Sequence, residues 1–155
     1  MLHGHGDDLH TCGQTIRANF SSNIFATTDL SALQQHLSAH LSVIGHYPEP
    51  EPYALESLWA DSLGLLPAEI CVTNGATEAI YLTAQAFRGA TSYIRQPTFS
   101  EYADACRMHG HSVRSLFTDE AIDDTPDLVW LCNPNNPTGE VRDRHTLLRL
   151  IDAHP

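Results

Sequence analysis

Apolar residues recur every three or four positions in the first half of the chain, a spacing that predicts amphipathic helices. The first helix follows Thr28 or Asp29, either of which suits an N-cap, and ends at Gly45. Its apolar positions are Leu30, Leu33, Leu37, Leu41 and Ile44. Three prolines in the segment 46–52 require an extended backbone before a second helix over 53–63.

Beyond Pro67 the pattern changes to short apolar runs that alternate with helical spacing. The runs predict strands, and the segments between them predict helices. Strands are expected at 70–72, 91–94, 112–116 and 128–132, and helices at 77–87, 100–109 and 145–151. This alternation predicts the α/β class, with a parallel sheet covered by helices and with ligands at the carboxyl ends of the strands.

The strand expected at 128–132 runs into a polar turn at 133–139 with the sequence Asn-Pro-Asn-Asn-Pro-Thr-Gly. Its prolines hold φ at about −65° and lack N–H donors, and Gly139 permits a positive φ. The Asn and Thr side chains of this turn are therefore expected to face a ligand at the carboxyl edge of the sheet.

Two other strand ends carry residues suited to a flat, phosphorylated ligand. The turn at 73–78 places a glycine before a helix whose first amides, those of Ala76 and Thr77, could hold a phosphate. A glycine that serves only helix packing is the alternative. Phe99 follows the next strand and could stack on a heterocycle, unless Phe99 is core and Tyr102 a surface residue. The P-loop and dinucleotide fingerprints are both absent.

Charge and composition restrict the partners. Eight arginines and no lysine face nineteen Asp and Glu residues, which gives 8 − 19 = −11, so nucleic acid and anionic membranes are not expected partners. With 42% hydrophobic and 17% charged residues, the composition is ordinary for a globular domain. The sequence has no apolar run of about 20 residues and no signal-peptide pattern, and we expect a cytoplasmic protein.

Ten histidines raise the question of a metal site. The candidate ligands are His3, His5 and His10 with Asp7 and Asp8 in the N-terminal arm, and His36 with His40 on a helix. Neither set is specific for a metal, and both suit a solvated surface. The four cysteines form no C-x-x-C pair. We therefore expect no bound metal.

Taken in chain order, the phosphate-type turn, the aromatic segment and the Asn-Pro-x-Asn-Pro-Thr-Gly loop resemble fold-type I pyridoxal-phosphate enzymes, the class I/II aminotransferase superfamily. The similarity runs from about His3 to the end and is greatest to the branch that contains histidinol-phosphate aminotransferase and threonine-phosphate decarboxylase. The resemblance implies that the amides of Ala76 and Thr77 bind the phosphate of pyridoxal 5'-phosphate. It also implies that Phe99 stacks on the pyridine ring and that Asn136 hydrogen-bonds the ring 3′ oxygen.

The same resemblance implies that Tyr47 reaches the cofactor phosphate of a neighbouring subunit, as part of a homodimer, and that Asn23 contacts an amino acid substrate. It divides the chain into two parts. Residues 1–66 would be the N-terminal arm and helices of the small domain and dimer arm. Residues 67–155 would be the first part of the large three-layer α/β/α cofactor domain.

No residue of the chain is assigned a catalytic role, because the family's Schiff-base lysine has no counterpart in a sequence without lysine. We expect the chain to be a segment of a longer polypeptide, or to be completed by another chain, since its strand at 70–72 would otherwise lack partners. The resemblance implies a histidinol-phosphate aminotransferase-like enzyme acting on an amino acid or amino acid phosphate. The alternatives are a threonine-phosphate decarboxylase-like enzyme and a catalytically inactive binding or assembly module of the same fold.

Overall fold

The computed structural model describes residue 13 and residues 15–24, 27–117, 122 and 125–153. The candidate metal ligands of the N-terminal arm lie outside these residues. The chain forms two compact units, one ending at Val72 and the other beginning at Thr73. The predicted division after residue 66 remains a prediction. Among the described residues, no helix is long and apolar enough to cross a membrane.

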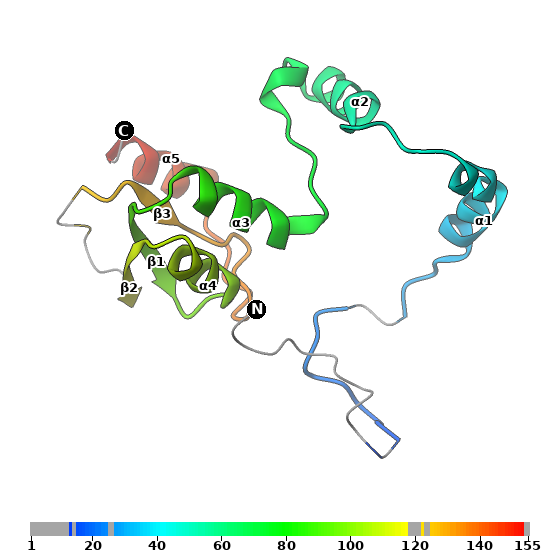
Figure 1. The fold of residues 1–155 in the computed structure, drawn as a ribbon. Coiled ribbons are helices and arrows are strands. Elements are labelled where there is room, and N and C mark those ends of the chain that lie inside the picture. The colour runs from blue at the N-terminus through cyan, green and yellow to red at the C-terminus, as the bar shows by residue number, and fades with distance from the viewer. Residues whose placement is uncertain (1–12, 14, 25–26, 118–121, 123–124, 154–155) are drawn as a thin grey trace. The chain divides into compact units, whose positions relative to one another are not determined.

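The first unit contains the two helices that the apolar spacing predicts (Figure 1). Helix α1 covers Ser31–Ala39 and a 3-10 helix covers Leu41–Gly45, so the single helix predicted to Gly45 is broken. The break lies at His40, whose φ of −109° and ψ of 12° leave the helical region. Helix α2 covers Tyr53–Leu63, as predicted, and a short 3-10 turn follows at Pro67–Glu69.

The start of α1 differs by one residue from the prediction. Leu30 holds the N-cap position and makes no side-chain cap bond. Asp29, one residue earlier, accepts a hydrogen bond of 2.9 Å from the backbone N–H of Ser31. This bond lowers the pKa of the Asp29 carboxyl, so the predicted capping side chain is present but displaced along the chain.

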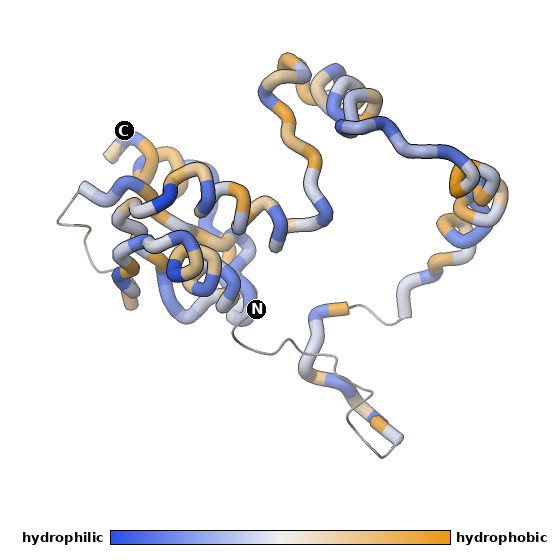
Figure 2. Tube along the Cα trace, viewed as in Figure 1, coloured by the Kyte–Doolittle hydropathy of each residue, from blue (hydrophilic) through white to orange (hydrophobic). Residues whose placement is uncertain are grey.

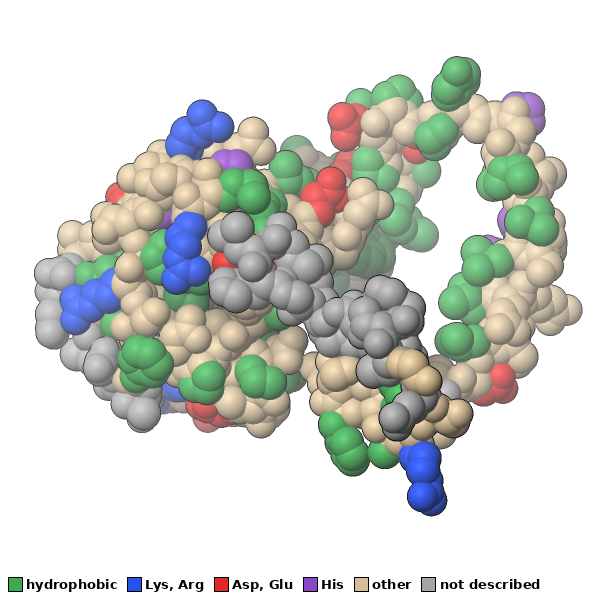
Figure 3. All heavy atoms as spheres, turned by 60° about the horizontal axis from the view of Figure 1, so that its bottom comes forward, with side chains coloured by type: hydrophobic (Ala, Val, Ile, Leu, Met, Phe, Trp, Pro, Cys, Tyr) green, Lys and Arg blue, Asp and Glu red, His purple; other side chains and the backbone are tan. Residues whose placement is uncertain are grey.

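The apolar side chains of α1 and α2 are largely exposed within their unit, as Figure 3 shows along this part of the chain. Leu37 is 56% exposed and Leu58 is 65% exposed, whereas Ala60 is fully buried. The predicted amphipathic pattern therefore forms real helices whose apolar faces are not covered by their own unit.

The second unit is built on a three-stranded parallel sheet with the order β2-β1-β3 (Figure 1). Strand β1 covers Thr91–Gln96, β2 covers Ser112–Phe117 and β3 covers Leu128–Trp130. The helices between and around them are α3 (Gly75–Ala86), α4 (Glu101–Met108) and α5 (Arg144–Ala153). The predicted parallel α/β alternation is thus confirmed for these elements.

The strand predicted at 70–72 is not formed. Ile70 has extended dihedrals, φ −112° and ψ 134°, but no described strand pairs with this segment. The backbone N–H of Val72 instead donates to Oε1 of Glu56 at 3.2 Å. A strand needs a hydrogen-bonded neighbour as well as extended dihedrals, and this apolar segment has only the dihedrals.

Helices α3 and α4 cover one face of the sheet. Ile94, on the central strand, is fully buried and packs with Ala103 and Cys106 of α4, and a second cluster joins α3 to α4 through Ile80 and Ala105. Figure 2 shows hydrophobic residues running through this part of the chain. Because side chains alternate along a strand, β3 also presents side chains to the other face of the sheet.

That opposite layer is α5. Val129 and Leu131, from β3 and the residue just after it, line a hollow of about 610 Å³ together with Leu147 and Leu150 of α5. The fold is therefore α/β/α in three layers, densely packed on the α3 and α4 side and open on the α5 side.

A buried histidine fixes the direction of α3. His111 Nε2 lies 2.8 Å from the carbonyl oxygen of Ala84 and its Nδ1 lies 2.8 Å from Oγ of Ser92. Since a carbonyl can only accept, Nε2 donates to Ala84. The contact ties the last turn of α3 to the starts of β1 and β2, so the first turn of α3 points to the carboxyl edge of the sheet.

The face of the sheet that α3 and α4 cover is expected to contribute most to the stability of the second unit. Replacing the fully buried Ile94 with alanine should lower the free energy of unfolding by about 2–5 kcal/mol, because it removes apolar contacts and leaves a cavity. The control is Leu82→Ala in α3, where the side chain is 45% exposed and the cost should stay within about 1 kcal/mol. Urea unfolding of both variants measures the difference, and equal losses would contradict the assignment of the core.

Candidate functional site

One asparagine joins the loops that follow β1 and β3. These strands are parallel neighbours with Ile94 opposite Trp130, so their loops leave the same edge of the sheet. Asn135 Nδ2 donates to the carbonyl oxygen of Pro97 at 2.9 Å. Thr98 Oγ1 in turn donates to Asn135 Oδ1 at 2.8 Å. We call this pair of contacts the Asn135 bridge.

The same asparagine also shapes its own loop. Its Nδ2 donates to Thr138 Oγ1 at 2.8 Å, and its backbone N–H donates to the carbonyl oxygen of Glu140 at 2.8 Å. Gly139 donates back to the carbonyl oxygen of Asn135 at 2.7 Å and has a φ of 72°, which glycine adopts without strain. Asn133 closes the base of the loop, bonding the backbone N–H and carbonyl of Arg142 at 2.8 and 3.2 Å.

This geometry corrects the expectation that the polar side chains of the turn all face a ligand. Asn133, Asn135 and Thr138 use their side chains to build the loop. Asn136, the residue assigned to the ring oxygen, is half-buried and follows the bridging residue directly. Its role toward a cofactor remains a prediction.

Phe99 lies beside the other end of the bridge. It follows Thr98, is half-buried, and packs against the cluster formed by Ile80 and its neighbours. Its ring meets that of Tyr102 edge-on, with centroids 6.3 Å apart and an interplanar angle of 89°. Part of the Phe99 side chain therefore belongs to the hydrophobic core, as the alternative interpretation of the sequence expects. Its ring is held in a defined plane at the carboxyl edge.

The first turn of α3 has the features expected of an anion-binding turn. Gly75 has a φ of 80° and donates to the carbonyl oxygen of Thr73 at 2.8 Å. Glu78 Oε2 accepts from both the backbone N–H and Nδ2 of Asn74. Ala76 and Thr77 are exposed, and the amides of a first helical turn have no acceptor within the helix. The residues present therefore fit a phosphate group.

The structure places the predicted residues in two groups. Ala76, Thr77, Phe99 and Asn136 all belong to the second unit, on the turns and loops at the carboxyl edge of its sheet. Tyr47 and Asn23 are exposed and belong to the first unit. Their predicted contacts with a cofactor and a substrate remain predictions.

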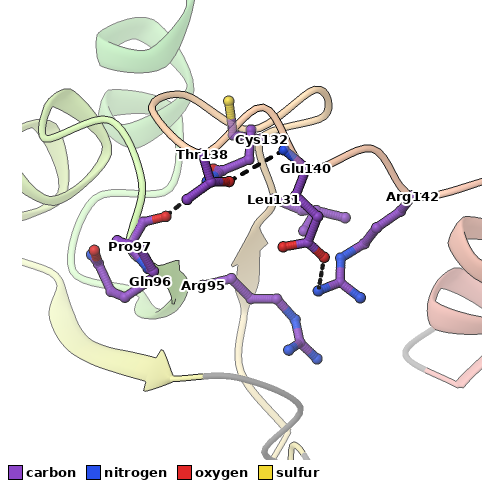
Figure 4. A pocket seen from close by; sticks show the side chains of 9 residues that line it. Arg95, Gln96, Pro97, Leu131, Cys132, Thr138, Glu140 and Arg142 are labelled. Atoms are coloured by element: carbon purple, nitrogen blue, oxygen red, sulfur yellow. Dashed lines mark hydrogen bonds and ion pairs between the residues drawn. The ribbon is translucent and has the colours of Figure 1, made fainter.

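A small cavity lies under the bridge (Figure 4). Its volume of about 60 Å³ suits water rather than a pyridine ring with a phosphate. Its lining includes Arg95, Cys132 and Arg142, which the sequence pattern did not single out. Within the described part of the chain, no cluster of three or more His, Cys, Asp or Glu residues could hold a metal.

Two tyrosines near this edge have raised pKa values. Burial raises the pKa of Tyr102 to about 12, and a hydrogen bond with Cys132 adds to the effect. Burial likewise raises the pKa of Tyr81 to about 12, followed by a hydrogen bond with Glu101, itself almost fully buried. Both phenols therefore stay protonated at neutral pH.

The raised tyrosine pKa values predict a loss of stability in alkali. A phenol titrates near its ordinary pKa of 10.0 when unfolded and at about 12 in the fold, so its stabilising contribution is complete below pH 10 and is lost as the pH rises toward 12. Tyr81→Phe and Tyr102→Phe should each reduce this loss of stability at high pH. Unfolding experiments across this range, with tyrosinate absorbance, test the expectation. Ionisation of all tyrosines in a single step near pH 10 would contradict it.

The Asn135 bridge should contribute measurably to the stability of the fold. Asn135→Ala removes the side-chain bonds to Pro97, Thr98 and Thr138 and should lower the free energy of unfolding by about 1–3 kcal/mol. In a double-mutant cycle with Thr98→Val, a coupling of about 1 kcal/mol is expected because the two side chains bond directly. Asn133→Ala is the matched control, since it disturbs the same loop but should show no coupling with Thr98→Val.

Comparison with known proteins gives a family match. The family described as aminotransferase class I and II matches residues 16–155. A curated relative, histidinol-phosphate aminotransferase 1 of Bacillus cereus (strain ZK / E33L), is 30% identical over 121 residues, which are 70% of this chain and 33% of that protein. The chain thus spans about a third of the length of the curated relatives that it matches.

Solved structures share the fold. L-threonine-O-3-phosphate decarboxylase from Porphyromonas gingivalis superposes with a TM-score of 0.80 at 42% identity, covering 86% of this chain and 42% of that one. Histidinol-phosphate aminotransferase from Sinorhizobium meliloti, in complex with pyridoxal-5'-phosphate, gives a TM-score of 0.67 at 18% identity, covering 81% and 38%. Together with the match over residues 16–155, these findings confirm the predicted resemblance: the chain belongs to the class I and II aminotransferases, a pyridoxal-phosphate-dependent family.

Proposed function

We propose that this chain supplies the first part of a pyridoxal-phosphate-dependent aminotransferase, similar to histidinol-phosphate aminotransferase, that acts on an amino acid or an amino acid phosphate. The observation that carries the proposal is the Asn135 bridge, which holds the loops of Phe99 and Asn136 together at the carboxyl edge of the sheet. The family match over residues 16–155 supports it independently.

In this proposal each residue binds or orients the cofactor. The amides of Ala76 and Thr77, at the positive end of the α3 dipole, hold the phosphate. Phe99 fixes the plane of the ring, and the Asn136 amide donates a hydrogen bond to the ring oxygen. When bound, the cofactor acts as an electron sink for charge that develops next to the substrate amine. The sequence contains no lysine, so the covalent attachment of the cofactor depends on residues outside these 155.

The remaining assignments extend the proposal. Tyr47 would contact the cofactor phosphate of a second subunit in a homodimer, and Asn23 would contact the substrate. Residues 1–66 would form the arm and helices of the small domain, and residues 67–155 the start of the cofactor domain. The exposed apolar faces of α1 and α2 are in keeping with helices that are covered in a larger assembly. We place the enzyme in the cytoplasm.

A second candidate function is the decarboxylation of an amino acid phosphate. It is favoured by the 42% identity and the TM-score of 0.80 to the L-threonine-O-3-phosphate decarboxylase structure. Both candidates use the same cofactor site and differ in which bond to the substrate's α-carbon breaks. An inactive binding or assembly module is a third possibility, favoured by the missing lysine.

Cofactor titration tests the site. In the complete encoded polypeptide, Phe99→Leu and Asn136→Ala should each raise the Kd for pyridoxal phosphate by about tenfold, because each removes a contact worth about 1 kcal/mol or more. Phe87→Leu is the matched control: this phenylalanine is 47% exposed, at the opposite end of α3. Cofactor absorbance measures the binding. Unchanged affinity in both site variants would refute the assignment.

Product analysis then separates the candidate reactions. With histidinol phosphate and a 2-oxo acid, an aminotransferase forms the corresponding amino acid and releases no carbon dioxide. With L-threonine O-3-phosphate alone, a decarboxylase releases carbon dioxide. Cofactor binding without either product would favour the inactive module.

A further inference from the structure

Tyr102, in the first turn of α4, contacts the candidate ring-stacking residue directly. Its ring meets that of Phe99 edge-on, with centroids 6.3 Å apart and an interplanar angle of 89°. The two residues are three positions apart where α4 begins, and the backbone N–H of Tyr102 donates to the carbonyl oxygen of Phe99 at 3.4 Å. Positions with this spacing are neighbours on a helical turn, so the local backbone brings the two rings together.

The core of the second unit holds Tyr102 itself in place. Tyr102 packs against both clusters described above, that of Ile80 and that of Ile94. Its ring also lies against that of Trp130 on β3, with centroids 5.4 Å apart and an interplanar angle of 49°. Because side chains in a close-packed interior cannot turn without moving their neighbours, the ring of Tyr102 is a fixed surface.

The hydroxyl of Tyr102 makes a further connection at the end of β3. It hydrogen-bonds with Cys132, and Cys132 Sγ donates to the carbonyl oxygen of Pro134 at 3.3 Å. Cys132 and Pro134 lie at the start of the loop that carries Asn136, so Tyr102 joins that loop to the aromatic contact. A thiol is a weak hydrogen-bonding group, and we expect the ring of Tyr102 to contribute more than its hydroxyl.

We propose that Tyr102 is a positioning residue for pyridoxal phosphate: its ring sets the orientation of the Phe99 ring, which in turn sets the plane of the cofactor ring. The inference rests on the proposed function, because it takes Phe99 as the residue that stacks on the cofactor. Phe99 is half-buried, and edge-to-face contact between two aromatic rings has a preferred geometry. Without the ring of Tyr102, Phe99 keeps its apolar surface but loses the contact that selects its plane.

Titration of the complete encoded polypeptide with pyridoxal 5'-phosphate tests the proposal, with absorbance reporting the affinity and visible circular dichroism the orientation of the bound ring. The cofactor is achiral, so the intensity of its circular dichroism band depends on how the site holds it. Tyr102→Leu should raise the Kd by about three- to tenfold and change this band. Tyr102→Phe keeps the ring, so its Kd should stay within about twofold of the original and its band should be unchanged.

Tyr81→Leu is the matched control. Tyr81 packs against the same cluster as Phe99 and Tyr102, but it forms none of the ring pairs found among the described residues. Its removal disturbs the core without touching the Phe99 ring contact, so the Kd should stay within about twofold and the circular dichroism band should keep its intensity.

The double variant Phe99→Leu/Tyr102→Leu separates positioning from general support of the fold. If Tyr102 acts through Phe99, the second substitution should raise the Kd of Phe99→Leu by less than about twofold. Losses that multiply would show that Tyr102 acts independently of Phe99, against the proposal. Far-UV circular dichroism establishes that each variant is folded. If Tyr102→Leu does not fold, Tyr102→Met takes its place with the same expected results, because methionine fills irregular gaps in a core.

The other outcomes are also decisive. An unchanged circular dichroism band in Tyr102→Leu would overturn the proposal whatever the affinity, since orientation is what Tyr102 is proposed to set. Equal effects of Tyr81→Leu, or of Tyr102→Phe, would assign the loss to the core or to the hydroxyl and would overturn it as well. If Phe99→Leu weakens binding and Tyr102→Leu does not, the positioning role fails and the cofactor site stands. If neither Phe99→Leu nor Asn136→Ala changes the affinity, the cofactor site fails and this inference fails with it.

Discussion

The arrangement of the carboxyl edge depends on one uncharged side chain. Phe99 and Asn136 are 37 positions apart, and parallel pairing of β1 with β3 brings only the bases of their loops together. Beyond the strands, the backbone has no ladder to hold it. Asn135 replaces that ladder, because a single amide group supplies both donors and an acceptor and can satisfy Pro97 and Thr98 at once. This bridge therefore sets the relative placement of Phe99, the candidate for stacking on the cofactor ring, and Asn136, the candidate for bonding the ring oxygen.

The position of the first turn of α3 at the carboxyl edge depends on a buried contact at the opposite edge of the sheet. His111 connects the last turn of α3 to β1, and a helix held at its C-terminal end has its first turn directed to the opposite edge. The first turn of α3 is therefore positioned by packing and hydrogen bonding at the opposite edge of the sheet. The dense layer of α3 and α4 provides this rigidity, whereas α5, across a hollow of about 610 Å³, provides little.

The sequence predicted the elements of the second unit well because their apolar spacing is set by burial that the unit itself provides. Strands β1 and β2 and helix α3 lie within two residues of the expected bounds. The segment at 70–72 was wrongly predicted because strand pairing depends on a neighbour, which no local pattern reveals. The candidate site was only partly predictable for a similar reason. Asn133, Asn135 and Asn136 have the same chemistry, and their sequence order alone cannot tell which of them build the loop.

The chemistry of the bridge is suited to a site that receives an anion in an acidic chain. An aspartate at position 135 would have a similar shape, but it would lack the donors to Pro97 and Thr138 and would add a negative charge beside the expected phosphate. Glu78, the carboxylate in the first turn of α3, is engaged by Asn74, which leaves the next amides, those of Ala76 and Thr77, to face an incoming group. With a net charge of −11, long-range attraction cannot bring a phosphate to this chain, so anion binding must come from local donors. The backbone amides at the start of α3 are local donors of this kind.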